Sequence, residues 1–523
     1  VDLQLKAGVG KDAASDVIRI SQDGKAYLDL SSYMANASPA GGSKEITYES
    51  NPELGITFTK SGEDTWYDFV EDKENHTVKV NLTASDGKQR EGCINVLVGE
   101  KENTTAAKLR VLQIGEDTES LIFEVRINYD DYTFKNGGVY KTNGGDLDVT
   151  IDWGDGSEPE HFVNVQPSHK YAKAGKYTVE TKGTAPSYCL TDIAGDYFTI
   201  TDGIKHVNFL NIISWGKLGV KDVKNVCKTD EELESIPDDV CGTFAEITDF
   251  TDMFVNCYSL KAIPENLFKY AVKAKKFYET FGYAASLKSI PENLFANCPE
   301  ATDFGLCFYG VGTGSAVLQG EGNSHAKVLK PFVSKGNRIE IPEGLFRNNT
   351  KATNFTQTFR DMNIATVPEN LFANNTEVTS FNGLFTGCTE LETVPADLFK
   401  NNQKVKDFKW LFYATDVKSL PVGLFKHCPA GFAIQINQMF QNAIIEDFPE
   451  GFFEGLDGVT SLYSVFESAV FMKPLKGGIF KGMAKANTLN NVFYRTNVTE
   501  LPENLFEGMG ANATSISLSS AFF

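Results

Sequence analysis

The sequence predicts a multidomain chain in which two all-β sandwiches precede a long stack of short repeats. Three observations support this fold class. A proline-centred motif recurs with a nearly constant period between Pro237 and Pro502, short apolar stretches separated by turn residues fill positions 18–115, and a tryptophan-containing turn follows at Trp153. The length of 523 residues leaves room for two to four domains. We therefore divide the chain into residues 1–115, 116–200 and 201–523.

The repeat is clearest at Leu391 to Phe399, where an apolar pair precedes a Pro-x-x-Leu-Phe core. Successive prolines from Pro237 to Pro502 lie 27, 27, 51, 26, 27, 26, 28, 25 and 28 residues apart. Self-similarity at a fixed period of about 20 to 50 residues is typical of proteins built from stacked repeats. The core begins at Pro264, Pro291, Pro342, Pro368, Pro395, Pro421, Pro449 and Pro502, with more divergent copies at Pro237 and Pro474.

Each repeat is expected to contribute a brief strand and a short helix. The two apolar side chains before the proline point into a shared core, and the proline then starts a helix at its first position, where its missing N–H costs nothing. One repeat cannot bury this many aromatic side chains alone, so stability must come from its neighbours. We expect a phenylalanine eight to ten residues before the proline to be a core residue in eight copies: Phe254, Phe281, Phe359, Phe385, Phe412, Phe440, Phe466 and Phe493.

These units resemble the leucine-rich repeats of the BspA-like bacterial surface proteins, whose pattern runs Phe-x-x-Cys, then Leu-x-x-Ile, then Pro. Cys257 and Cys388 stand three residues after their phenylalanines. The resemblance covers roughly 209–523, and it implies an α/β leucine-rich-repeat solenoid of short strands and short helices in a cell-surface interaction protein. The Leu-Phe after the proline and the longer period depart from the commonest version of the repeat.

Two segments interrupt the periodicity. Residues 201–236 supply apolar side chains without the proline, which suits an N-terminal cap over the first repeat. The interval of 51 residues indicates an insertion at 311–335, and such insertions leave the stack as surface loops that often lie on the binding face. Two interpretations stay open, a neutral variation in length or a ligand-binding loop. On the second interpretation the candidate contacts are Gln319, Glu321, Asn323, His325 and Lys327.

The first β region is predicted to be an antiparallel sandwich, because strands are expected at 45–48, 78–82, 94–98 and 109–112 with turn residues between them. It also contains Gly41-Gly42 before a strand, Trp66, and a turn from Arg90 to Ile94. In these features it resembles the BACON domain. The resemblance implies a small immunoglobulin-like fold that is appended to surface proteins and glycan-degrading enzymes of Bacteroidetes. Carbohydrate binding and a spacer role both remain open for it.

The second β region contains Trp153-Gly154-Asp155-Gly156, followed by His169 to Tyr171 and then by Gly175 to Val179. This signature resembles the polycystic-kidney-disease (PKD) domain, another β-sandwich of extracellular proteins. Trp153 is expected in the core, and the two glycines are expected in a tight turn that needs positive φ. Asp155 and His169 could be mistaken for a catalytic pair, but we interpret both as fold residues because Asp155 belongs to the turn.

The composition excludes some classes of binding partner, and the start of the chain indicates where the protein is located. The 49 basic and 69 acidic residues give a formal charge of −20, which argues against nucleic acid or an anionic membrane as partner. No apolar run approaches the roughly 18 residues of a membrane span. The chain starts at Val1 without Met or an apolar leader, so we expect a processed protein. We expect it to be secreted or anchored at the outer membrane, and a lipid anchor upstream of Val1 is one means of anchoring.

The sequence contains no recognisable catalytic template. It lacks a Gly-x-Ser-x-Gly elbow, a His-Glu-x-x-His pair and a phosphate-binding loop, and its six histidines are scattered. Nine cysteines without a Cys-x-x-Cys pair are expected to act as small buried residues. We therefore predict that the chain is not an enzyme and that it binds no cofactor or metal ion. The function predicted is an adhesin or receptor that binds a host or bacterial surface protein or glycan through the repeats. The alternative is a glycan-capture protein of a polysaccharide-utilisation system that binds through its N-terminal sandwiches and uses the repeats as a scaffold.

Overall fold

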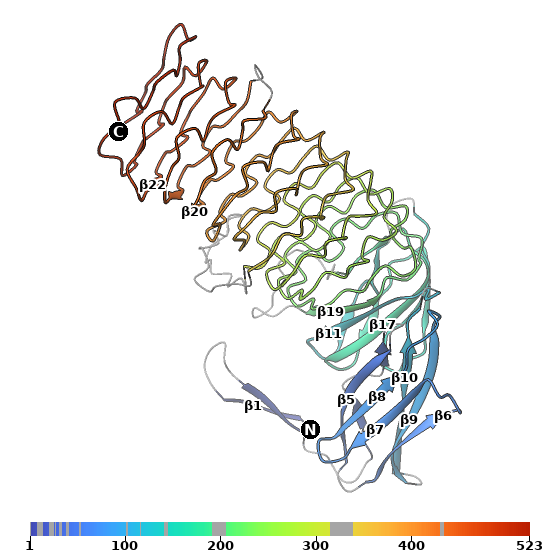
Figure 1. Ribbon diagram of the computed structural model, residues 1–523. Coiled ribbons are helices and arrows are strands. Elements are labelled where there is room, and N and C mark those ends of the chain that lie inside the picture. Colours follow the sequence, from blue (N-terminus) through green and yellow to red (C-terminus); the bar gives the residue numbers. More distant parts are fainter. Residues whose placement is uncertain are drawn as a thin grey trace. The chain divides into compact units, whose positions relative to one another are not determined.

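The chain divides into two compact units in the computed structural model (Figure 1). The first contains Val1–Thr118 with Asp152–Pro159 and Gly175–Glu180, and the second contains Glu119–Ile151, Glu160–Ala174 and Thr181–Phe523. The structure describes residues 2–7, 14–19, 26, 28–30, 34–37, 41–51, 54–100, 103–115, 117–140, 145–190, 206–313, 338–428 and 433–522.

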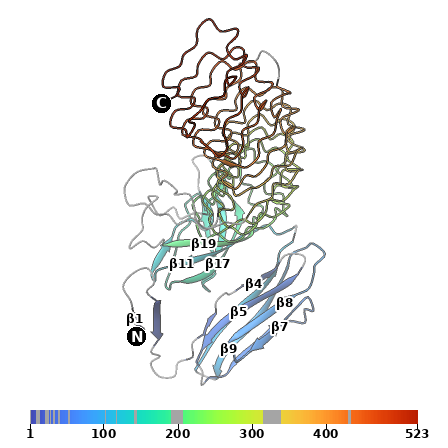
Figure 2. The same ribbon diagram turned by 60° about the vertical axis from the view of Figure 1, so that its left-hand side comes forward.

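Two four-stranded sheets make up most of the first unit (Figure 2). Their strand orders are β4-β10-β9-β6 and β3-β5-β8-β7, and neighbours run antiparallel except for the parallel pair β4 and β10. A separate antiparallel pair is formed by β1 and β2. The bounds are β1 Asp2–Ala7, β2 Ala14–Arg19, β3 Leu28–Leu30, β4 Met34–Ala37, β5 Gly42–Ser50, β6 Ile56–Ser61, β7 Tyr67–Asp72, β8 Thr77–Leu82, β9 Arg90–Glu100 and β10 Asn103–Gln113.

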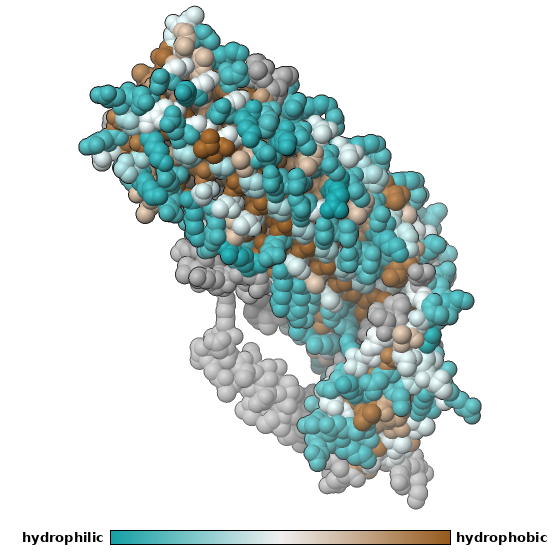
Figure 3. Space-filling view, in the orientation of Figure 1, coloured by the Kyte–Doolittle hydropathy of each residue, from teal (hydrophilic) through white to brown (hydrophobic). Residues whose placement is uncertain are grey.

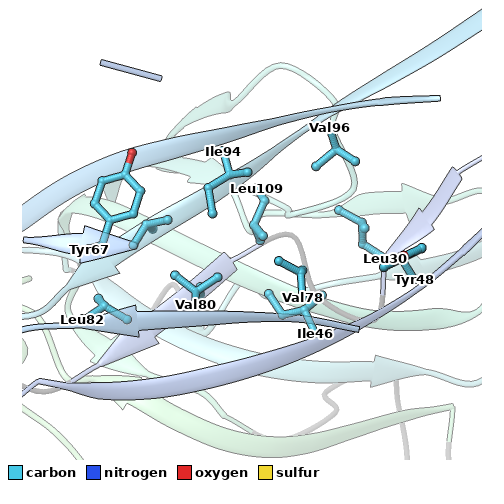
Figure 4. Close-up of a cluster of buried hydrophobic side chains, with 12 residues drawn as sticks. Leu30, Ile46, Tyr48, Tyr67, Val78, Val80, Leu82, Ile94, Val96 and Leu109 are labelled. Carbon is cyan, nitrogen blue, oxygen red and sulfur yellow. The ribbon is translucent and has the colours of Figure 1, made fainter. Parts of the chain in front are cut away.

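Both sheets contribute side chains to one hydrophobic core (Figure 4). Along β8, Val78 and Val80 are buried while Lys79 and Asn81 are exposed, as expected for a strand with one face toward a core. The buried ring of Tyr67 keeps its hydroxyl satisfied by donating to the carbonyl of Cys93 at 3.0 Å. The strands predicted at 45–48, 78–82, 94–98 and 109–112 lie inside β5, β8, β9 and β10, so these predictions are confirmed.

The second β region contains a five-stranded sheet with the order β15-β14-β17-β11-β19 and two small two-stranded sheets. Trp153 follows β14 and is fully buried, as predicted. Gly154 and Gly156 have φ of 76° and 85°, which confirms the predicted turn. A Cβ on Gly154 would lie 2.2 Å from the carbonyl oxygen of Thr178, so only glycine fits. The bounds are β11 Leu121–Ile127, β12 Tyr132–Phe134, β13 Val139–Tyr140, β14 Asp148–Asp152, β15 Glu160–Val163, β16 His169–Tyr171, β17 Gly175–Thr184, β18 Ser187–Tyr188 and β19 Val207–Ser214.

Strand β19 joins this sheet to the repeats. It pairs with β11 on one side, and on the other its Ile212 N–H donates to the Ser235 carbonyl at 3.0 Å. Trp215, 2 % exposed, places its ring 5.1 Å from Phe244 and donates its indole N–H to the Pro237 carbonyl. Residues 207–236 therefore cover the first repeat with hydrogen bonds and an aromatic contact. The boundaries drawn from the sequence stay predictions.

The repeats stack in register as successive coils (Figure 1). Equivalent residues pair through single parallel bridges, and Asp303 pairs directly with Asn354 across the 51-residue interval, so that interval is one step of the stack. Three two-residue strands, β20 Asp416–Val417, β21 Ile444–Ile445 and β22 Val470–Phe471, pair in parallel. One row of bridged residues contains Asp249, Lys276, Asp303, Asn354, Ser380, Asp407 and Gln435.

A column of stacked phenylalanine rings fills the interior of the repeats. The eight phenylalanines predicted as core are all buried, the most exposed being Phe493 at 4 %. Rings of neighbouring repeats are nearly parallel, as for Phe254 and Phe281 at 5.5 Å and 11°. On the face visible in Figure 3, the surface of the repeats is mostly hydrophilic, with a narrow line of apolar residues along the stack. The prediction of a shared phenylalanine core is confirmed.

The predicted short helices are wrong. The described residues contain no helix, and the chain after each proline forms successive turns instead. Leu267 donates to Pro264 and Ala271 donates to Phe268, which are bonds to the third residue back and not to the fourth. So short a segment gains too few hydrogen bonds to offset the cost of starting a helix, whereas tight turns point both Leu267 and Phe268 into the core.

Candidate functional site

A repeated backbone pattern creates one continuous face along the stack. In the repeat at 250–257, Asp252 and Asn256 have left-handed φ of 57° and 61°. The N–H groups of Phe250, Asp252, Phe254 and Asn256 all donate to carbonyls of the next repeat at 2.8–3.0 Å. Because these peptide groups point along the stack, their hydrogen bonds join one repeat to the next. The side chains then point either into the core or outward.

The side chains of this segment alternate in pairs. Phe250, Met253, Phe254 and Cys257 are buried, whereas Thr251, Asp252 and Asn256 are partly exposed, and Val255 at the remaining position is also buried. The same order of inward and outward positions recurs in neighbouring repeats, with a few outward positions buried, such as Thr386 and Ser464. We call the outward positions of these segments the turn face; the segments are 250–257, 277–284, 304–311, 355–362, 381–388, 408–415, 436–443, 462–469 and 489–496.

Several left-handed positions of the turn face carry bulky side chains. Tyr283, Leu306 and Trp410 have φ of 58°, 56° and 58°, while Gly383 holds the position equivalent to Trp410 one repeat earlier. Left-handed backbone costs an ordinary residue roughly 1–2 kcal/mol. The equivalent position is left-handed in all nine segments, for example at Gln357 and Gln438, so the conformation belongs to the repeat, and Trp410 differs from its equivalents by its large exposed ring.

In the N-terminal half of the turn face, the side chains form a network of contacts with one another. The hydroxyls of Tyr283 and Tyr309 are hydrogen-bonded, and the Arg360 guanidinium lies 4.8 Å from the centre of the Tyr309 ring. Arg360 also donates to Gln357 at 3.0 Å and to Asp361 at 3.4 Å. Burial raises the pKa of Asp361, and Arg360 opposes that rise. These polar groups already have partners inside the chain.

Further charges in this half are also compensated internally. Lys228 donates to Asp252 at 2.7 Å. Burial raises the pKa of Glu279, the charge of Asp252 raises it further, and Lys228 counteracts both. This half of the face therefore offers few uncommitted groups to a ligand.

The C-terminal half exposes aromatic rings beside neutral amides. Trp410 and Tyr463 are 37 % and 41 % exposed and lie two repeats apart. Gln438, in the repeat between them, accepts a hydrogen bond from the Trp410 indole at 2.9 Å and donates to Gln441 at 2.7 Å. Asn442 donates to the Tyr413 hydroxyl at 2.9 Å. We call Trp410, Tyr413, Gln438, Gln441, Asn442 and Tyr463 the aromatic strip.

No known family model, curated protein or solved structure matches this chain.

The side-chain groups of the strip and of the rest of the described chain limit the chemistry that is available. Among the described residues no group of three or more His, Cys, Asp and Glu side chains is placed to hold a metal ion. The part of the chain that the structure describes holds no helix that could cross a bilayer. Burial raises the pKa of the thiols of Cys298 and Cys428 to about 12, which keeps them protonated and unreactive near neutral pH. The strip can stack against a ligand and exchange hydrogen bonds with it.

The binding residues predicted from the insertion lie outside the described residues: Gln319, Glu321, Asn323, His325 and Lys327. The aromatic strip was not predicted from the sequence, because only the repeated phenylalanines were interpreted there, as core residues. An alignment of the repeats on Phe254, Phe412 and their equivalents gives a signal. It places Trp410 in a column that otherwise holds polar residues, Leu306 and glycine, all of them with left-handed backbone.

Proposed function

We propose that this chain is a non-enzymatic binding protein of the cell surface and that the turn face of its repeats contacts the ligand. The observation that carries the proposal is Trp410, which is exposed and has left-handed backbone although Gly383 fills the same position in the preceding repeat. Tryptophan and tyrosine supply a large contact area at low cost in conformational entropy, and they are enriched at binding hot spots.

We also propose a finer description of the fold. The two sheets of the first unit and the Trp153 region are immunoglobulin-like sandwiches of the BACON and PKD kinds, and the stacked repeats are a leucine-rich-repeat solenoid. Support comes from the core shared by the two sheets, from the turn at Gly154, and from the parallel pairing of equivalent repeat positions. A stack of this kind presents one extended surface to its partner.

The proposed location is extracellular, on the cell surface or secreted, because all three resemblances are to domains of surface proteins. The proposed partner is a host or bacterial surface protein or a glycan. Nucleic acid is disfavoured by the formal charge of −20.

The test is a binding screen with the full chain. Purified protein is applied to an array of neutral and acidic glycans and to an array of extracellular proteins, and each bound ligand is recovered and weighed by mass spectrometry. The proposal predicts saturable binding to at least one ligand, recovered unchanged in mass. Failure to bind any ligand on either array, or conversion of a ligand into a product, would contradict it.

A further inference from the structure

We propose that the aromatic strip binds a neutral, linear, β-linked oligosaccharide that lies along the stacking direction. This inference rests on the proposed function, because it names the ligand class for the same face. Its evidence is the spacing of the two exposed rings, the hydrogen-bonding groups between them, and the low charge around them.

The spacing of the rings suits alternate sugar units of an extended chain. The phenylalanines beneath the strip mark the rise per repeat: Phe412 to Phe440 is 5.3 Å and Phe440 to Phe466 is 5.6 Å. Trp410 and Tyr463 belong to the first and third of these repeats and stand at adjacent outward positions of their segments, so along the stack their backbones lie two such steps apart. That separation is close to the length of a β-1,4-linked disaccharide. The flat C–H faces of β-linked pyranose rings are apolar surfaces that can cover an aromatic ring.

The groups between the rings suit hydroxyl ligands. Gln438, Gln441 and Asn442 each carry an amide oxygen that accepts and an amide nitrogen with two N–H groups that donate. Their known bonds, to Trp410, Tyr413 and each other, use only part of this capacity. A sugar hydroxyl both donates and accepts, so a row of hydroxyls can engage a row of amides without any change of charge.

The electrostatic setting favours a neutral ligand. Of the twelve outward positions in the three repeats of the strip, only Lys409 and Glu467 are charged. The Lys409 ammonium already lies 3.5 Å from Asp407. An anionic glycan would have no cation here that is not already paired, and a cationic glycan could pair with only one outward carboxylate, Glu467.

A protein partner is favoured less. Protein hot spots lie in well-packed pockets and are surrounded by contacts that exclude water. The neighbours of Trp410 and Tyr463 on the strip are amides and a hydroxyl, so the apolar contact is limited to the ring faces. Binding to a protein alone is therefore an outcome that would overturn the inference.

Two substitutions can remove the rings without disturbing the stack. Trp410→Gly installs the residue that Gly383 provides one repeat earlier, and it relieves a left-handed tryptophan. Tyr463→Asn installs the residue that Asn490 provides one repeat later. Glu279→Gly is the matched control, since it makes the same backbone change at a left-handed position on the other half of the turn face.

The experiment is calorimetric titration of the full chain with a β-1,4-linked glucose hexamer, with an α-1,4-linked glucose hexamer as ligand control. We expect the β-linked hexamer to bind and the α-linked hexamer to bind more weakly. Trp410→Gly and Tyr463→Asn should each lower affinity about tenfold or more, as loss of a stacked ring does at other aromatic platforms. The thermal midpoint of Trp410→Gly should not fall, and Glu279→Gly should bind like the unmodified chain.

Three results would overturn the inference, and they are distinguishable from failure of the proposed function. Binding to extracellular proteins but to no neutral glycan would refute the ligand class and leave the binding function standing. Undiminished hexamer binding by a folded Trp410→Gly protein would refute the strip as the site. Equal or stronger binding of the α-linked hexamer would refute the requirement for an extended chain. Absence of binding to every ligand on both arrays would refute the proposed function itself.

Discussion

Single residues on the turn face show where the chain gives up stability. Trp410 and Tyr283 have left-handed backbone, and Glu279 is a carboxyl group whose pKa is raised mainly by burial and secondly by Asp252. Each would be replaced in a sequence optimised for stability alone. A destabilising residue of this kind is a candidate for a functional role, because the fold does not require it.

Substitution of Glu279 by Gln should stabilise the protein at neutral pH. A carboxyl group with a raised folded pKa binds its proton more tightly in the native state, so stability is lost as pH rises from the unfolded value of about 4.3 through the folded pKa. At pH 7 the ionised Glu279 is therefore destabilising, and Gln removes that cost. We expect a higher thermal midpoint for Glu279→Gln at pH 7 and no gain at about pH 3.5. An equal gain at both pH values, or a loss at pH 7, would rule out this explanation.

A buried asparagine connects neighbouring repeats. The Asn375 amide donates to the carbonyls of Phe346 at 3.0 Å and Asn349 at 2.8 Å. Asn349 and Asn402 make the same two bonds in their own repeats. Each of these carbonyls also accepts a backbone N–H within its own turn, as Phe346 does from Asn349 at 3.1 Å, so the amide adds a second bond that ties one repeat to the next.

Asn375→Ala should cost about 2–3 kcal/mol, because it removes two buried hydrogen bonds between neighbouring repeats. The control is Asn374→Ala at the adjacent exposed position, where one amide donates to the Arg347 carbonyl at 2.9 Å and the cost should stay below about 1 kcal/mol. Urea titration of both variants measures the difference. Equal midpoints for the two variants would contradict the role assigned to the buried amide.

At the scale of the repeat, two features keep neighbouring coils in register. The stacked phenylalanines fix the spacing, and pairs of opposite charge lie above one another on the surface. Lys273 lies 2.5 Å from Glu246, Lys351 lies 2.6 Å from Glu300, and Lys404 lies 2.5 Å from Glu377. Exposed pairs contribute little to stability, with a median of about 0–1 kcal/mol. Their alternating sign along the stack instead disfavours pairing of the wrong repeats.

The phenylalanine column should account for much of the stability. Phe412→Ala removes a fully buried ring that stacks on Phe385 at 6.0 Å and on Phe440 at 5.3 Å, and such truncations cost about 3–5 kcal/mol. Phe522→Ala is the control, because that ring is half exposed. The urea midpoint should fall strongly for the first variant and weakly for the second. An unchanged midpoint for Phe412→Ala would show that the column is not the core.

For the whole molecule, the sequence was informative about side chains and less informative about backbone. Period and residue type located the buried phenylalanines, the strands around 78–82 and 94–98, and the turn at Gly154. They could not reveal the paired left-handed residues, because that conformation is stabilised by hydrogen bonds between repeats that lie about 27 residues apart. For the same reason tight turns were mistaken for helices.

The candidate site was harder to find than the fold. The sequence carried a prediction for the repeated phenylalanines but none for Trp410, whose exposure follows only from its place in the turn. Length variation drew attention to 311–335 instead, and the five residues predicted there lie outside the described structure. An exposed ring is recognisable only once the buried and outward positions of the repeat are known.

The central claim is that ligand binds on the turn face of the repeats and not on the N-terminal sandwiches. The chain has four tryptophans, of which Trp153 and Trp215 are buried, Trp66 is partly buried in the first unit, and Trp410 is exposed on the turn face. The most direct test is tryptophan fluorescence of the full chain during titration with its tightest ligand from the arrays, in Trp410→Phe and Trp66→Phe variants. The account predicts that the ligand-induced change disappears in Trp410→Phe and persists in Trp66→Phe. Persistence in Trp410→Phe with loss in Trp66→Phe would contradict it and place binding on the first sandwich.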